Sequence, residues 1–156
     1  MRTLAERQTI QAAKAIQARE RKERKASKPA QVVKMGQQPR VRDNEHLKRI
    51  RRLPCLATLI RTGEEAFRVD ACHVRANYSS PGWGGNPGLA CKPSDWRTLP
   101  LKRSQHMLQH SMNEIQYWNE LHVHPPTVCA ALRDAESFEA MLNVIRNAAR
   151  IARETR

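Results

Sequence analysis

The apolar positions of the chain are concentrated after residue 52, where they predict short strands and helices. Residues 53–60 form an apolar stretch, a turn follows at 63–65, and residues 67–74 have the composition of a strand. Residues 76–95 hold four of the six glycines and three prolines, which predicts a long loop. Residues 96–101 then predict a second strand, closed by Pro100.

Helical periodicity dominates the rest of the chain. Apolar residues recur at helical spacing over residues 103–121 and predict one helix there, namely Leu108, Met112, Ile115 and Trp118. A second helix is expected at about 126–132, with proline at its start. Residues 135–154 predict a long helix whose inward face carries Phe138, Met141, Leu142, Ile145, Ala149 and Ile151.

The first 52 residues have a different character. Residues 3–27 contain neither glycine nor proline and favour a helix with a thin apolar stripe. Residues 28–44 have the composition of a linker, and residues 45–52 predict a short basic helical turn. We therefore expect an α+β protein with a basic, helical or disordered N-terminal arm and linker over 1–44, a small folded domain over 45–125, and C-terminal helices over 126–156 that pack on that domain.

Charge separates the arm from the remainder. The formal net charge is +13, and residues 1–52 carry 16 Lys and Arg against 5 Asp and Glu. This favours a polyanionic partner, nucleic acid ahead of an anionic membrane. The arm could be a solvated, fraying helix, or it could track DNA by displacing counterions from phosphate. No apolar run approaches the roughly 18–20 residues that span a bilayer. The four cysteines lack disulfide-like spacing, so we expect a reducing cytoplasmic setting.

Three histidines suggest the chemistry. His73 ends the first predicted strand, and His106 and His110 lie one turn apart near the start of the 103–121 helix. An imidazole pair at this spacing can bind one divalent metal, although such a pair can also be incidental. His73 suits general-base catalysis because neutral imidazole is populated at pH 7, but a structural role is the alternative. His122 and His124 are expected to be ordinary surface residues.

The order of these motifs resembles the HNH, or His-Me finger, nucleases. The motifs are Val-Asp-Ala-Cys-His-Val-Arg at 69–75, the glycine-rich loop, Lys-Pro-Ser-Asp at 92–95, Leu-Pro-Leu at 99–101 and His-x3-His at 106–110. Within that superfamily the chain is most similar to phage and prophage proteins of the YbcO and Ref type, over residues 53–121. The resemblance implies a ββα-metal fold and DNA nicking or cutting in phage recombination or packaging, in the cytoplasm of a bacterial host.

The resemblance also assigns roles to individual residues. His73 falls on the general base, His106 and His110 fall on metal ligands, and Asp95 would orient the base or a ligand. Cys72 stands where many members carry a metal ligand, but thiolate suits Zn²⁺ and not Mg²⁺, and a small buried residue is the alternative interpretation. We expect basic residues to contact nucleic acid at Arg75, Lys92, Lys102 and Arg103.

Two departures from the family, the cysteine at position 72 and the missing zinc cysteines, leave the function open. Relatives often bind a structural zinc through cysteines that this chain replaces with Lys102 and Gln105, so we expect one divalent metal (Mg, Mn or Zn) and no structural zinc. The expected partners are DNA and, as a further candidate, a recombinase, with no membrane; the oligomeric state is open. The alternative function is a non-catalytic DNA-binding or recombination accessory protein with a degenerate site. A third is a basic helical adaptor in which the histidines are incidental.

Overall fold

The structure is a computed structural model that describes residues 40–83 and 92–155, together with six helical positions between residues 11 and 23. The chain divides into two compact units, Met1–Lys34 and Met35–Arg156. In the first unit, Arg19 and Glu23 form an exposed ion pair at 3.8 Å. The other positions of the predicted arm and linker, and the glycine-rich part of the predicted loop at 84–91, lie outside the described residues.

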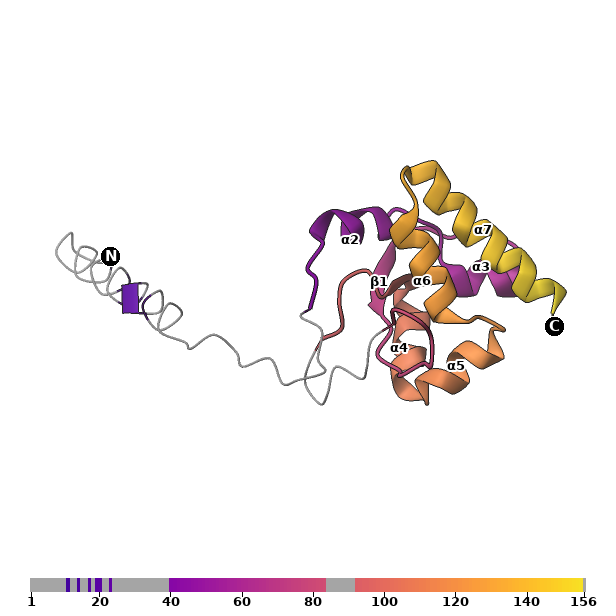
Figure 1. Cartoon of the computed structure of the whole chain (residues 1–156), viewed down its shortest axis with the longest axis horizontal. Helices are drawn as coiled ribbons and strands as arrows, with labels where there is room; N and C mark the ends of the chain where they lie inside the picture. The colour runs from indigo at the N-terminus through magenta and orange to yellow at the C-terminus, as the bar shows by residue number, and fades with distance from the viewer. Residues whose placement is uncertain are drawn as a thin grey trace, which may run out of the picture. The chain divides into compact units, whose positions relative to one another are not determined.

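The second unit is mixed α+β, as the hydrophobic pattern predicts (Figure 1). Its elements are, in chain order, α2 (Asn44–Ile50), α3 (Leu56–Thr62), β1 (Val69–His73), β2 (Thr98–Lys102), α4 (Arg103–Ser111), α5 (Glu114–Glu120), α6 (Pro125–Asp134) and α7 (Phe138–Glu154). None of the described helices combines the length and the apolar character needed to cross a bilayer.

The two strands form an antiparallel pair that runs directly into α4. His73 lies opposite Thr98, and Ala71 lies opposite Pro100. Pro100 sits inside β2 and does not close it as expected. Val74 donates to the carbonyl of Arg97, which makes these two residues a hydrogen-bonded pair of the antiparallel ladder. Hydrogen-bonded and non-hydrogen-bonded pairs alternate along the strands, so the pair of Ala71 and Pro100 is a non-hydrogen-bonded one. The missing N–H of Pro100 therefore costs the ladder no hydrogen bond.

The predicted 103–121 helix is wrong in one respect, because the structure has two helices there. Met112 adopts an extended conformation (φ −131°, ψ 177°), and the Asn113 side chain accepts hydrogen bonds from the backbone N–H groups of Ile115 and Gln116. Asparagine is a strong N-cap, so it starts a new helix inside the periodic pattern. The predicted apolar stripe is partly solvent-facing as a result, with Leu108 39% and Ile115 42% exposed.

The C-terminal helices cover the domain. α7 packs against α3 and α6, and α6 also contacts β2. The face of α7 that enters the core carries Met141, Ile145, Ala149 and Ala152. Ile151, which we placed on this face, is 54% exposed. Ala152 takes the inward position one residue later, because 3.6-residue periodicity from Ile145 and Ala149 reaches 152.

Candidate functional site

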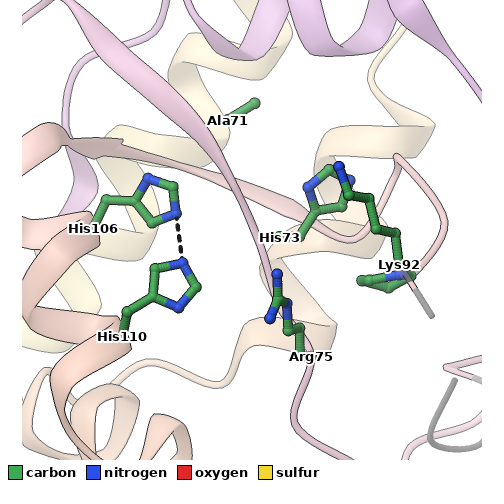
Figure 2. A pocket seen from close by; sticks show the side chains of 7 residues that line it. Ala71, His73, Arg75, Lys92, His106 and His110 are labelled. Carbon is green, nitrogen blue, oxygen red and sulfur yellow. Dashed lines mark hydrogen bonds between the residues drawn. The ribbon is translucent and has the colours of Figure 1, made fainter. Parts of the chain in front are cut away.

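The three predicted histidines come together at one pocket. It has a volume of about 140 Å³ and is lined by Ala71, His73, Arg75, Lys92, Pro93, His106 and His110 (Figure 2). β1 and its C-terminal extension contribute the first three, the end of the long loop the next two, and α4 the last two. The volume is sufficient for a cation and a few water molecules.

His73 is oriented by a buried carboxylate. Its Nε2 lies 3.1 Å from Oδ1 of Asp95, and its side chain is 22% exposed. An ionised carboxylate only accepts hydrogen bonds, so Nε2 carries the hydrogen and Nδ1 of the neutral ring is left as an acceptor. Burial lowers the pKa of His73 and outweighs the opposing effect of Asp95, while Arg40 and Lys92 lower it further. The ring is therefore neutral at pH 7.

Asp95 accepts hydrogen bonds from three directions. Besides His73, its partners are Nη2 of Arg40 at 2.7 Å and the backbone N–H of Asp43 at 3.1 Å. Burial by itself raises the pKa of this carboxyl, but the bonds from Arg40, His73 and Asp43 together bring the pKa below its ordinary value. Asp95 is therefore a carboxylate although it is only 2% exposed. Sequence reasoning placed Arg40 and Asp43 in a linker and missed both, since no periodicity marks them.

The two histidines of α4 face each other. Their Nε2 atoms are 3.1 Å apart (Figure 2). Nδ1 of His106 lies 2.9 Å from Oδ2 of Asp70. Asp70 also accepts from Arg103 at 3.2 Å, and the bond with His106 is the main reason why the pKa of Asp70 is lowered. Burial, followed by the neighbouring His106, lowers the pKa of His110. Asp70 was missed from the sequence; its only signal there is that it is the acidic residue of β1.

The pair has the donor spacing that a single cation requires. Two ligand nitrogens at about 2.0–2.1 Å from one ion lie about 2.8–3.4 Å apart for octahedral to tetrahedral angles, which includes the observed 3.1 Å. Since Asp70 accepts from Nδ1 of His106, the Nε2 lone pair of that ring faces His110. Among residues 40–83 and 92–155, no group of three or more His, Cys, Asp or Glu is arranged to hold a metal. The described part of the pocket thus offers two imidazole nitrogens as candidate metal ligands.

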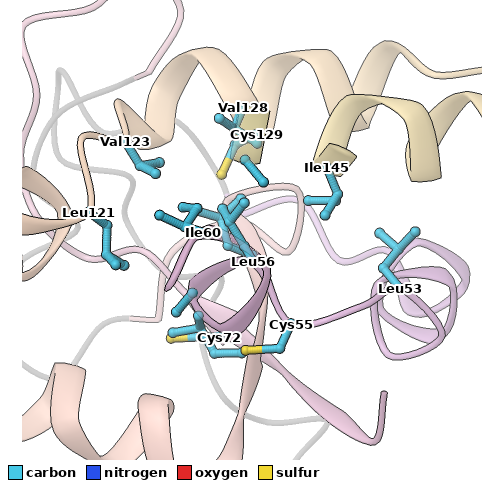
Figure 3. Close-up of a cluster of buried hydrophobic side chains, with 14 of the residues drawn as sticks. Leu53, Cys55, Leu56, Ile60, Cys72, Leu121, Val123, Val128, Cys129 and Ile145 are labelled. Carbon is cyan, nitrogen blue, oxygen red and sulfur yellow. The ribbon is translucent and has the colours of Figure 1, made fainter. Parts of the chain in front are cut away.

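Cys72 does not line the pocket. It is fully buried in the hydrophobic cluster (Figure 3). Its Sγ is 3.6 Å from Oε1 of Gln109. Burial raises the pKa of the thiol well above its ordinary value, so the group is protonated. A cysteine side chain must be deprotonated to the thiolate to bind a metal ion. This placement favours the small buried residue over the ligand that we considered. Cys55 is also buried, and its sulfur accepts from the backbone N–H of Lys102.

The predicted basic residues divide into two groups. Arg75 and Lys92 are exposed and line the pocket. Lys102 and Arg103, where β2 passes into α4, do not line it. The Arg103 side chain is 75% exposed and pairs with Asp70 at the edge of the site.

Glu114, the first residue of α5, fixes the chain beyond His73. Its carboxylate accepts from the backbone N–H groups of Arg75 at 3.0 Å and Ala76 at 2.9 Å. Trp83 holds the start of the loop by donating to the carbonyl of Ala76 and packing under the Arg97 guanidinium, 4.0 Å from the ring centre. Trp83 is only 3% exposed, which leaves little of its ring for nucleotide stacking.

His122 and His124 lie outside the pocket lining. His122 has a left-handed backbone (φ 53°) after α5, and His124 contacts Thr127 and the ring of Tyr78.

Comparisons of the chain with protein-family models, curated proteins and solved structures found no match. The case for a function therefore rests on the pocket and its residues.

Proposed function

We propose that this protein is a metal-dependent DNA endonuclease of the HNH type, in which His73 activates water and His106 and His110 hold one divalent cation. The observation that supports this most strongly is that all three imidazoles line one pocket, while Asp95 fixes the ring of His73. The order of two antiparallel strands and a following helix agrees with the ββα arrangement of these nucleases. By the same resemblance, we propose a phage or prophage origin and action in a bacterial cytoplasm.

The proposed general base is Nδ1 of His73. With Nε2 donating to Asp95, this nitrogen has the free lone pair that can take a proton from water. The imidazolium that forms is stabilised by the Asp95 carboxylate, which Arg40 and Asp43 keep ionised. This is the division of labour between a base and an orienting carboxylate in hydrolytic triads.

The proposed metal ligands are the Nε2 atoms of His106 and His110. Asp70 accepts from the other nitrogen of His106, which holds that ring in the tautomer a cation needs. Imidazole suits Zn²⁺ and other transition metals, and water could complete the coordination of Mg²⁺ or Mn²⁺. When bound, the cation would neutralise charge on the scissile phosphate and on the leaving 3′ oxygen.

Arg75 and Lys92 are the proposed phosphate contacts, because both are exposed cations on the pocket wall. Lys102 and Arg103, at the start of α4, would contact phosphates farther along the strand. These contacts carry charge but read no base, so they predict affinity without sequence selectivity. A recombinase remains a further candidate partner.

The test is a titration of the full chain with Mg²⁺, Mn²⁺ and Zn²⁺, in which DNA binding and strand cleavage are measured on the same samples. We expect cleavage that requires a divalent ion and yields 3′-hydroxyl and 5′-phosphate ends. His106→Ala and His110→Ala should lose metal binding and cleavage, while His124→Ala, a histidine outside the pocket, should behave as the parent does. Binding to DNA without new termini under every metal would instead favour the non-catalytic accessory protein.

A further inference from the structure

The segment 40–43, which precedes α2, is bound to the loop that carries Asp95. The backbone N–H of Val41 donates to Oγ of Ser94 at 3.0 Å, and the carbonyl of Val41 accepts from the N–H of Asp95 at 2.9 Å. Arg40 and the N–H of Asp43 then grip the two oxygens of the Asp95 carboxylate. This segment thereby contacts the carboxylate that orients the candidate base, from 52 to 55 residues away in the chain.

Arg40 contributes the one charged donor among these contacts. Oδ1 of Asp95 is shared between Nη2 of Arg40 at 2.7 Å and Nε2 of His73 at 3.1 Å, whereas Oδ2 faces Asp43. The Arg40 side chain is 31% exposed and the Asp95 side chain 3%, so the carboxylate depends on Arg40 for neutralisation. A buried carboxylate that loses its cation is costly and readily takes up a proton.

The orientation of His73 follows from this contact. If Asp95 lost Arg40, only the Asp43 N–H would restrain the carboxylate besides His73 itself, and the carboxyl group could rotate. The charged and titratable groups around His73 are otherwise Lys92, Arg75, His106 and His110 on the pocket wall. Among the described pocket residues these groups include cations but no carboxylate, so none of them supplies a negatively charged acceptor for Nε2–H in place of Asp95.

We propose that Arg40 is a positioning residue of this site: it holds Asp95 so that His73 keeps its hydrogen on Nε2 and presents Nδ1 to the pocket. The expected effect of Arg40 on the cleavage rate rests on the proposed function, whereas its expected effect on the tautomer of His73 does not. It extends the site to a residue that lies outside the strand–loop–helix motif and before α2.

The experiment compares full-length parent, Arg40→Ala, Arg40→Lys and the control Arg42→Ala. Arg42 is an exposed arginine two residues away, so it matches the charge change without the contact to Asp95. Nitrogen-15 NMR of the histidine rings, measured above the titration range of His73, reports which ring nitrogen carries the hydrogen. Cleavage kinetics on the same proteins separate kcat from KM.

We expect the parent, Arg40→Lys and Arg42→Ala to show the Nε2–H form of His73 and Arg40→Ala to show a mixture of both tautomers. In Arg40→Ala, kcat should fall about ten- to hundredfold with little change in KM, and Arg40→Lys should recover most of it. An Arg40→Ala protein with the parent's tautomer would overturn the inference, as would an equal change in Arg42→Ala. If the parent does not cleave DNA, the proposed function fails, and the tautomer measurement still decides the role of Arg40. If Arg40→Ala does not fold, Arg40→Gln, which removes the charge but keeps part of the side chain, takes its place: a mixed tautomer there supports the inference, and the parent's tautomer overturns it.

Discussion

Replacing Asp95 with asparagine tests the organisation of the site with almost no change in side-chain shape. The carboxylate accepts from Arg40, from the backbone of Asp43 and from His73. Asparagine offers one oxygen and one NH₂ group, so at least one of these donors meets another donor. One lost charge-assisted bond costs about 1.5–3 kcal/mol and one unsatisfied buried donor about 1–3 kcal/mol. The neutral amide is cheaper to bury, so we expect a net loss of about 2–4 kcal/mol in the free energy of unfolding.

The same substitution should impair His73 even where the protein stays folded. The amide oxygen can take the place of Oδ1 and still accept from Nε2–H, but a neutral amide does not stabilise the imidazolium that forms when His73 takes up a proton. We expect cleavage to fall by about 10²-fold or more.

Urea denaturation and a plasmid-nicking assay measure the two effects of Asp95→Asn. The matched control is Asp134→Asn, because Asp134 pairs only with its neighbour Arg133 on the surface of the described chain. The control should nick DNA at the parent's rate. If Asp95→Asn is as stable as the parent and nicks as fast, the carboxylate does not orient the base.

Three further predictions concern pH, the end of β1 and the arm. His46 is 4% exposed, and burial lowers its pKa from 6.5, so the unfolded chain takes up a proton at a higher pH than the folded chain does. The stability of the protein should therefore fall as the pH drops below about 6.5. In thermal unfolding, His46→Phe should show a shallower fall with pH, and an unchanged pH dependence would refute the role of His46. Glu114→Ala removes the acceptor for two backbone N–H groups and should lower the free energy of unfolding in urea by about 1–3 kcal/mol. Replacing the exposed Glu120 with alanine should lower it much less. Equal losses of stability would exclude a specific role of Glu114 in fixing the chain after His73. Deleting residues 1–30 should weaken DNA binding equally for all sequences and flatten its salt dependence, and unchanged affinity at low salt would remove the arm from the interface.

The elements near the site could be predicted because local rules agree there. Strand-like composition locates β1 and β2, helical periodicity locates α7, and the i, i+4 spacing places His106 and His110 on one helix face. That His73 faces the same pocket could be expected only from the order of the motifs and its resemblance to known nucleases. Periodicity within a segment says nothing about which segments meet.

The errors have a common physical cause, which is that a single polar contact can override a pattern. Asn113 caps α5 and divides the predicted long helix. Arg40 and Asp43 belong to the site because of their contacts with Asp95, more than 50 residues away, and neither lies in a periodic segment. Asp70 was overlooked for the same reason, since its role is visible only once α4 is placed beside β1.

The most direct test of the account is the rate at which His73→Ala cleaves DNA in the presence of Mn²⁺, with folding checked by circular dichroism and metal binding by calorimetry. We predict a folded protein that still binds the metal through His106 and His110 and cleaves about 10²–10⁴-fold more slowly than the parent. Cleavage at the parent's rate by the folded variant would contradict the assignment of His73 as the base and, with it, the central claim that the three histidines form one hydrolytic site.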